Sequence, residues 1–210
     1  MDNILVSSAY LAPTSYYIAL YNAKSATIEQ YENYIKQSYR NRCTIGGANG
    51  TMNLSIPIEK PANGKAHMRD IRISEHGNWR HLHWNALISA YRSTPFFEYY
   101  ADDFAPLYEK RVEFLLDFNE QIREIISSYL NVETPITLTS EYIDQPTSDT
   151  LDLRERIDPK KEIGLGAAFE TKPYYQVFSS KYGFQPNLSI VDLLFNMGPE
   201  GELILRDSYL

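Results

Sequence analysis

A tight turn inside the stretch 30–57 constrains the fold more than any other feature of the sequence. Asn49-Gly50 tolerates the positive φ angles of a hairpin turn, and polar and apolar residues alternate after it. The alternating apolar residues are Met52, Leu54, Ile56 and Ile58. We therefore expect a β-hairpin, with strands over residues 42–45 and 51–58 and these four side chains on one buried face.

The residues before the hairpin predict a β-α-β unit. Residues 4–8 form an apolar run typical of a buried strand, and residues 14–22 have the pattern of a helix that begins at Thr14-Ser15. Residues 26–30 can form the second strand. Because open α/β sheets bind ligands at the carboxyl ends of their strands, residues 7–15 are expected to line a site. The sequence contains no glycine-rich phosphate loop.

The spacing of the apolar residues becomes helical after Asn78. Helices are expected over residues 79–92, 95–103, 112–130 and from Asn187 or Ser189 to Met197. Further strands are expected over residues 70–74, 136–139 and 174–178. Pro106 is expected to begin a separate segment after the second helix. Residues 31–39 fit either a helix or an irregular arm.

These elements together predict an α/β fold. We expect a single domain over residues 1–210, with a mixed sheet, a β-α-β start, a β-hairpin and a helical middle section over residues 79–130. Residues 140–163 are polar, contain Pro146 and Pro159 and carry charges of both signs. We expect this segment to be a mobile loop or a lid.

The charge and the cysteine content exclude several classes of protein. The 27 Asp and Glu residues outnumber the 20 Lys and Arg residues, and the resulting net charge of −7 argues against a nucleic-acid-binding protein. The single cysteine, Cys43, excludes an internal disulfide and a cysteine-ligated metal cluster. The sequence begins with no leader pattern and contains no apolar run of about 18 residues, so we expect a cytoplasmic protein without membrane contact.

Tyrosine is the over-represented aromatic residue, with 17 Tyr against 9 Phe. Its ring is apolar and its hydroxyl is polar, so tyrosines often line half-wet clefts or interfaces, although most single rings serve packing. Two functions of different class follow. One is an enzyme with a tyrosine-lined pocket, and the other is a non-catalytic binding or scaffold protein that uses a tyrosine-rich surface.

Three cations lie among tyrosines directly before the hairpin: Lys36, Arg40 and Arg42. Arginine presents a planar fork that matches phosphate or carboxylate oxygens, and lysine adds a point charge. On a strand, Arg40 and Arg42 share one face, whereas Asn41 points to the opposite face or holds the turn. This cluster is a candidate anion site. The alternative is a solvated charged face that is neutralised by nearby carboxylates.

The segment 79–85, WRHLHWN, is the second candidate constellation. His81 and Asn85 lie one helical turn apart, so they can contact one ligand or each other. His81 is a candidate general base, although a histidine in such a place more often serves packing. His81 and His83 point in directions about 200° apart and cannot share a metal on a regular helix. Neither a metal nor a cofactor is predicted.

Four blocks of the chain carry a resemblance to a known family. They are residues 8–13 (SAYLAP), 36–45 (KQSYRNRCTI), 79–91 (WRHLHWNALISAY) and 184–200 (FQPNLSIVDLLFNMGPE). Together they resemble the WbqC-like protein family of bacteria, and the last block is the most specific. Ser8 and Ala9 stand where the family usually has a Gln-Pro pair, and residues 147–171 form a shorter region than in longer members. If either region shapes the pocket, the substrate is expected to differ.

The resemblance implies no established reaction. Members of the family are associated with surface-polysaccharide gene clusters, so it implies at most a role in modifying an activated sugar. Our leading hypothesis is a cytosolic transferase that acts on a phosphorylated or nucleotide-activated sugar. In it, Arg40 and Arg42 hold the phosphate, Lys36 adds charge, Tyr10 or Tyr16 stacks on a ring, Asn41 and Asn85 contact the substrate, and His81 is the base. The sequence leaves the reaction and the oligomeric state open.

Overall fold

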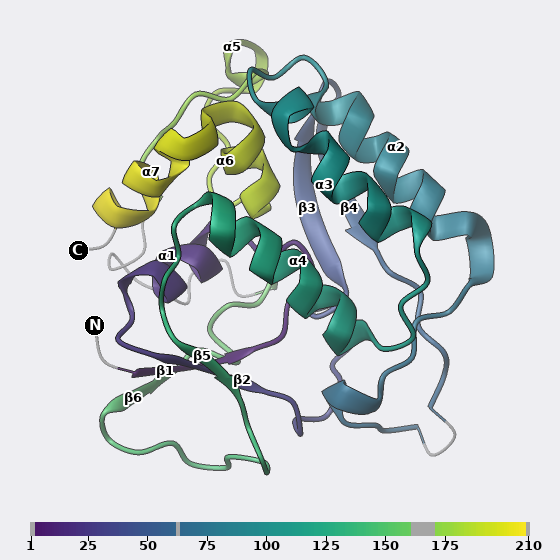
Figure 1. Ribbon diagram of the computed structural model, residues 1–210, viewed down its shortest axis with the longest axis vertical. Helices are drawn as coiled ribbons and strands as arrows, with labels where there is room; N and C mark the ends of the chain where they lie inside the picture. Colours follow the sequence, from purple (N-terminus) through teal and green to yellow (C-terminus); the bar gives the residue numbers. More distant parts are fainter. Residues whose placement is uncertain (1–2, 62–63, 161–170, 209–210) are drawn as a thin grey trace.

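The computed structural model describes residues 3–61, 64–160 and 171–208 of the 210-residue chain (Figure 1). The strands are β1 (Asn3–Ser7), β2 (Ala26–Glu29), β3 (Arg42–Gly47), β4 (Gly50–Ser55), β5 (Ile136–Leu138) and β6 (Thr150–Asp152). The α-helices are α1 (Thr14–Asn22), α2 (Trp79–Tyr91), α3 (Phe97–Glu109), α4 (Leu115–Tyr129), α5 (Ser179–Tyr182), α6 (Ile190–Met197) and α7 (Gly201–Asp207). Short 3-10 turns are η1 (Met68–Asp70), η2 (His76–Asn78) and η4 (Gly198–Glu200).

The four strands β1, β2, β5 and β6 form a parallel sheet in the order β5-β2-β1-β6. The central strand β1 is buried at Ile4, Leu5 and Val6, and Ile4 lies opposite Ala26 of β2 and Leu151 of β6. Helix α1 connects β1 to β2, which confirms the β-α-β start. The chain next adds β5 outside β2 and then returns to place β6 on the other side of β1, so the strand order reverses between β1 and β6.

The predicted hairpin is confirmed and forms a separate antiparallel sheet of β3 and β4. Gly47 lies opposite Gly50, and Gly50 has the φ of 99° that the tight turn requires. Leu54 and Ile56 are buried as predicted, but Met52 is 48% exposed. The prediction for Met52 is wrong because helices α2 and α6 pack against β3, whereas β4 is the outer strand.

The helical middle section is also confirmed: α2 packs against β3 of the hairpin, α3 against α2, and α4 against α3 (Figure 1). It differs from the prediction at the helix ends, because α3 runs from Phe97 to Glu109 and α4 begins only at Leu115. Pro106 lies inside α3 and does not begin a new segment. Proline cannot donate a hydrogen bond to the carbonyl one turn earlier, here that of Asp102. Because Asp102 is exposed, solvent can satisfy its carbonyl, and the helix continues.

Two predicted strands are wrong. Residues 70–74 contain part of η1 and two isolated bridges, Ile58–Ile73 and Arg72–Phe114. Residues 174–178 belong to no strand, and the amide of Val177 donates to the side chain of Asn196 (Oδ1, 3.0 Å) instead of to a neighbouring strand. Tyr174 and Gln176 turn their polar groups towards the buried carboxylate of Asp192, each at 2.8 Å. Residues 31–39 take the irregular of the two predicted forms.

The segment 140–163, predicted to be a mobile loop or a lid, contributes β6 to the parallel sheet. Residues 161–163 of that prediction lie outside the described residues. The prediction of a lid therefore stays a prediction.

The C-terminal block anchors the loop that follows β1. Ser189 donates a hydrogen bond through Oγ to the carbonyl of Leu11 (2.8 Å), and the amide of Ile190 donates to Ala12 (2.8 Å). In return, the amide of Thr14 donates to the carbonyl of Leu188 (2.9 Å). Two of the four blocks that carry the family resemblance are therefore in direct contact. Within the described residues, no helix has the length and apolar character needed to cross a membrane.

Candidate functional site

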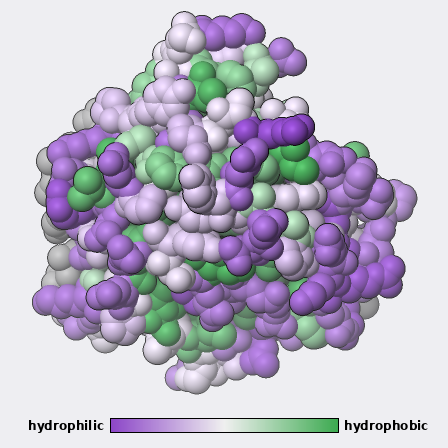
Figure 2. Space-filling view, turned by 45° about the horizontal axis from the view of Figure 1, so that its top comes forward, coloured by the Kyte–Doolittle hydropathy of each residue, from purple (hydrophilic) through white to green (hydrophobic). Residues whose placement is uncertain are grey.

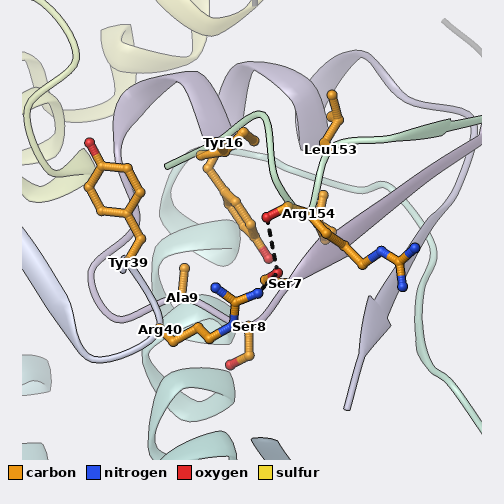
Figure 3. Close-up of a pocket in the computed structure, with 10 residues that line it drawn as sticks. Ser7, Ser8, Ala9, Tyr16, Tyr39, Arg40, Leu153 and Arg154 are labelled. Carbon is orange, nitrogen blue, oxygen red and sulfur yellow. Dashed lines mark hydrogen bonds between the residues drawn. The ribbon is translucent and has the colours of Figure 1, made fainter. Parts of the chain in front are cut away.

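A pocket lies where the carboxyl ends of β1 and β6 meet (Figure 3). Its lining residues are Val6, Ser7, Ser8, Ala9, Tyr16, Tyr39, Arg40, Leu153, Arg154 and Ile157. The strand order reverses between these two strands, and this is the place where open α/β sheets bind their ligands. The empty space is about 260 Å³ with its mouth included, and its enclosed part holds about one water molecule. We call it the strand-end pocket.

Polar groups from four segments converge in the strand-end pocket. Arg40 donates a hydrogen bond through Nη2 to Oγ of Ser7 (2.8 Å), and Ser7 in turn donates to the carbonyl of Arg154 (3.5 Å). The hydroxyl of Tyr16 points towards the same group of atoms (Figure 3). Burial raises the pKa of Tyr16 well above its ordinary value, so its phenol keeps its proton at neutral pH. The pocket therefore offers both donors and acceptors.

Arg40 is held in place by a buried ion pair. Its Nε and Nη2 donate to the two carboxylate oxygens of Glu32 at 2.8 and 2.6 Å, and both side chains are nearly inaccessible. Asn119 of α4 donates through Nδ2 to the carbonyl of Arg40 (2.9 Å) and to Oγ of Ser8 (3.0 Å). The guanidinium is thus rigid, and Glu32 balances its charge. Its Nη1 forms no hydrogen bond with another described residue.

Arg154 supplies its backbone to the pocket, while its guanidinium points away (Figure 3). The guanidinium pairs with Asp152 (Nη2 to Oδ2, 2.7 Å) and donates to the carbonyl of Ile143 (2.6 Å). Burial alone would raise the pKa of Asp152, but the hydrogen bonds from Arg154 outweigh it and lower that pKa. The fully buried Glu29 lies 3.6 Å from Arg154 and accepts a hydrogen bond from Thr139. These contacts cross-link the ends of β2, β5 and β6.

The other members of the predicted cationic cluster lie outside the strand-end pocket. Asn41 donates to the carbonyl of Ile56 (2.7 Å), and Arg42 donates through Nε to Oγ of Ser55 (3.2 Å), so both hold the hairpin. Lys36 is exposed. The structure therefore separates Arg40 from the two cations with which the sequence grouped it.

Tyr10 lies behind the pocket and not in it. Its hydroxyl is 2.9 Å from Nδ1 of His83 and 2.9 Å from the hydroxyl of Tyr108, and the residue is fully buried. Burial raises the pKa of Tyr10 and lowers the pKa of His83 to about 4. A ring enclosed in this way has no face that a ligand in the strand-end pocket can contact, which leaves Tyr16 and Tyr39 as its aromatic lining.

The predicted general base, His81, lies outside the strand-end pocket. His81 is exposed, its Nε2 is 2.8 Å from Nδ2 of Asn85, and it lines a second pocket at the start of α2. The two pockets share no lining residue. The described part of the chain contains no group of three or more His, Cys, Asp or Glu side chains that could hold a metal ion.

Two residues that form or support the strand-end pocket, Asn119 and Arg154, were not predicted from the sequence. Asn119 had a detectable signal, because it is a polar residue on the apolar stripe of α4, between Leu115 and Ile122. Arg154 had none, because the three-residue strand that precedes it shows no periodicity and resembles the polar segment around it.

Comparisons with known proteins agree with the resemblance, and the match to the family model contains the first three of the four blocks. A sequence model described as the WbqC-like protein family matches residues 8–168. The chain is similar to the uncharacterized protein Rv1507c of Mycobacterium tuberculosis, with 25% identity over 228 residues that cover 96% of both chains. No solved structure matches.

Proposed function

The chain belongs to the WbqC-like protein family, and from this premise we propose that it is a cytosolic transferase that binds a phosphorylated or nucleotide-activated sugar in surface-polysaccharide biosynthesis. The observation that carries the proposal is the convergence of Arg40, Ser7 and Tyr16 at the point where the strand order reverses. Arg40 is turned inward into a concave pocket and is only 3% exposed, which favours an enzyme over a scaffold protein.

The chemistry of the pocket suits a sugar better than a bare phosphate. Because Glu32 balances the charge of Arg40, an isolated anion would gain little net attraction there. Sugar hydroxyls both donate and accept hydrogen bonds, so they match the hydroxyls of Ser7 and Tyr16 together with the carbonyl of Arg154. The Nη1 of Arg40 would then contact one phosphate oxygen.

The size of the pocket favours a ligand that binds at its mouth. The enclosed part holds about one water molecule, so the sugar ring would lie against Tyr39 and Ile157, with only a hydroxyl or a phosphate oxygen reaching Arg40. Ser8 and Ala9, the residues that replace the family's usual Gln-Pro pair, line the same pocket. This position supports a substrate that differs from that of members with the Gln-Pro pair.

Ligand binding at this pocket is tested by a thermal-shift screen of sugar phosphates and nucleotide sugars, followed by calorimetry. A ligand at 100 times its dissociation constant adds about 2.7 kcal/mol, which raises the melting temperature of a chain of this size by about 5–10 °C. Ala9→Val fills the pocket without touching the Arg40–Glu32 pair and is expected to abolish the shift. The matched control Arg42→Ala removes a nearby cation outside the pocket and is expected to keep it. If no sugar ligand binds, or if Ala9→Val binds as the wild type does, the proposal fails.

Release of nucleotide from a bound nucleotide sugar, followed by ³¹P NMR, separates a transferase from a binding protein. The alternative of a scaffold with a tyrosine-rich surface has less support, because among the described tyrosines the buried side chains outnumber the exposed ones, which are Tyr99, Tyr142, Tyr175 and Tyr182. On the face in Figure 2, apolar residues form patches that are separated by hydrophilic side chains. The scaffold hypothesis would be favoured by a stable protein partner together with no ligand at Arg40.

A further inference from the structure

The outer strand of the hairpin, β4, is exposed along its middle. Residues 51–53 are all exposed, and Met52 is 48% exposed. Past the end of the strand the chain is joined by another segment, through a bridge between Ile58 and Ile73 and a hydrogen bond from the amide of Ser74 to the carbonyl of Pro57 (2.9 Å). We call residues 51–53 the open edge.

The backbone groups of the open edge point away from β3. Asn53 lies opposite Thr44, and the carbonyl of Thr44 accepts a hydrogen bond from the amide of Ser189 (2.8 Å), so it points away from β4. This pair is therefore a non-hydrogen-bonded pair of the ladder, and so is the pair two residues along, which contains Thr51. The amides and carbonyls of Thr51 and Asn53 thus face outward. Within the described residues, neither forms a backbone hydrogen bond with a segment beyond β4.

The hairpin is also uncharged, although 22% of the chain is charged and the net charge is −7. Residues 43–58 contain no Asp, Glu, Lys, Arg or His. Proteins commonly protect an exposed edge strand with charged side chains or proline, and β4 contains neither. Lys181, which donates to the carbonyl of Ala48 (2.9 Å), lies at the turn and not at the open edge. Two copies of this acidic chain can therefore meet at β4 without bringing like charges together.

A second copy fits the open edge when its β4 runs antiparallel and a two-fold axis passes through Met52. Thr51 of each copy then lies opposite Asn53 of the other, and each pair exchanges both of its N–H···O bonds. The two Met52 side chains meet at the axis in a non-hydrogen-bonded pair, in which opposite side chains lie closest. The pairing accounts for the exposure of Met52, which continues the apolar face of Leu54 and Ile56 but is not covered by the chain itself.

We propose that β4 pairs with β4 of a second copy of this chain, so that the two hairpins form one antiparallel sheet across a two-fold axis at Met52. The paired strands are short, and strand pairing alone is expected to bury less than the roughly 1,200 Å² of a stable interface. The dimer should therefore be weak and depend on concentration. The proposal is independent of the function proposed for the strand-end pocket, because no residue of β4 lines either pocket.

Analytical ultracentrifugation from about 10 µM to about 1 mM tests the dimer. The average mass of the wild type should rise from 24.3 kDa towards twice that value. Met52→Lys places two like charges opposite each other and is expected to weaken the dimer at least tenfold. The matched control Leu203→Lys makes the same change at a side chain of α7 that is 45% exposed, and it should dimerise as the wild type does.

A charge exchange tests the two-fold axis itself. Met52→Glu should also be monomeric, whereas an equal mixture of Met52→Lys and Met52→Glu should dimerise again, because opposite charges then meet across the strands. Met52→Cys should form a covalent dimer on mild oxidation faster than Leu203→Cys does, and the buried Cys43 does not compete.

Three results would each overturn the proposal. One is a Met52→Lys variant that dimerises as the wild type does, and another is a mixture of the two charged variants that stays monomeric. The third is a wild type that stays monomeric up to about 1 mM, which would leave the open edge to a strand of a different protein.

Discussion

The buried imidazole of His83 makes a testable contribution to the pH dependence of stability. Its ring packs against Tyr10 (5.7 Å between centroids) and Trp79 (5.1 Å), and the residue is 6% exposed. Burial lowers its pKa from 6.5 to about 4, and a hydrogen bond to the backbone of Ser55 opposes the shift only in part. The folded protein therefore keeps His83 neutral over a range in which the unfolded chain binds a proton.

The sign and the size of the effect follow from this difference. Between pH 6.5 and 4 the unfolded state holds more protons, so the free energy of unfolding falls as the pH falls. The stabilisation is fully present above pH 6.5 and is lost progressively towards pH 4. A pKa lowered from 6.5 to about 4 corresponds to about 3 kcal/mol over the whole window. This is a large part of the free energy of unfolding of a folded domain, which is typically about 5–15 kcal/mol.

The assay is equilibrium unfolding in urea at pH 7 and pH 4.5 for the wild type and for His83→Gln. Glutamine can keep a hydrogen bond to Tyr10 but does not titrate, so the wild type should lose about 2–3 kcal/mol more than the variant between the two pH values. The carboxylates titrate in both proteins and cancel in the comparison. His81→Gln, the same substitution at an exposed position of α2, is the matched control variant. A difference between wild type and His83→Gln below about 1 kcal/mol would refute the reasoning.

Two further predictions concern the packing around the sites. For the Arg40–Glu32 pair, either Arg40→Gln or Glu32→Gln alone is expected to cost about 3–5 kcal/mol, because it leaves one buried charge unpaired. The double variant should cost clearly less than the sum in a urea double-mutant cycle, and simple additivity would contradict the buried pair. Gly198→Ala is expected to destabilise by about 2–5 kcal/mol, because Gly198 has a φ of 57° and a Cβ there would lie 2.5 Å from the ring of Phe96. Gly77→Ala, with a φ of 79° and no atom within 4 Å, should cost only about 1 kcal/mol, and equal losses would show that the clash is not real.

The parts of the fold that the sequence predicted well are those with local signals. The Asn49-Gly50 turn and the apolar stripe of α4 are each specified by neighbouring residues, and both are where they were expected. β6 was missed because its three residues gain their strand geometry from pairing with β1, nearly 150 residues away in the chain. For residues 70–74 the error is the opposite one: a strand was predicted and none is present. The alternation of Ile71 and Ile73 can also occur in a segment that makes only isolated bridges to other elements.

The candidate site was harder to predict, because the spacing of residues along the chain does not determine which side chains form ion pairs or hydrogen bonds with each other. Arg40 and Arg42 are two residues apart, yet one is buried against Glu32 and the other supports the hairpin. The sequence analysis did not predict that Arg80 is buried, because an arginine in the first turn of a helix is usually exposed to solvent. Its burial depends on the packing of η2 and α3 around it, and no local pattern encodes that packing.

Tyr10 was expected to stack on a substrate, and its observed place suggests a different role for the loop after β1. Its hydroxyl joins His83 of α2 to Tyr108 of α3, each at 2.9 Å, one residue after Ala9 lines the strand-end pocket. Tyr108 also lines the second pocket, at the start of α2. The two pockets therefore share a rigid, fully buried support although they share no lining residue. Loss of the hydroxyl in Tyr10→Phe would leave His83 and Tyr108 each without one buried partner, so its cost should fall on stability and on the order of both pockets together.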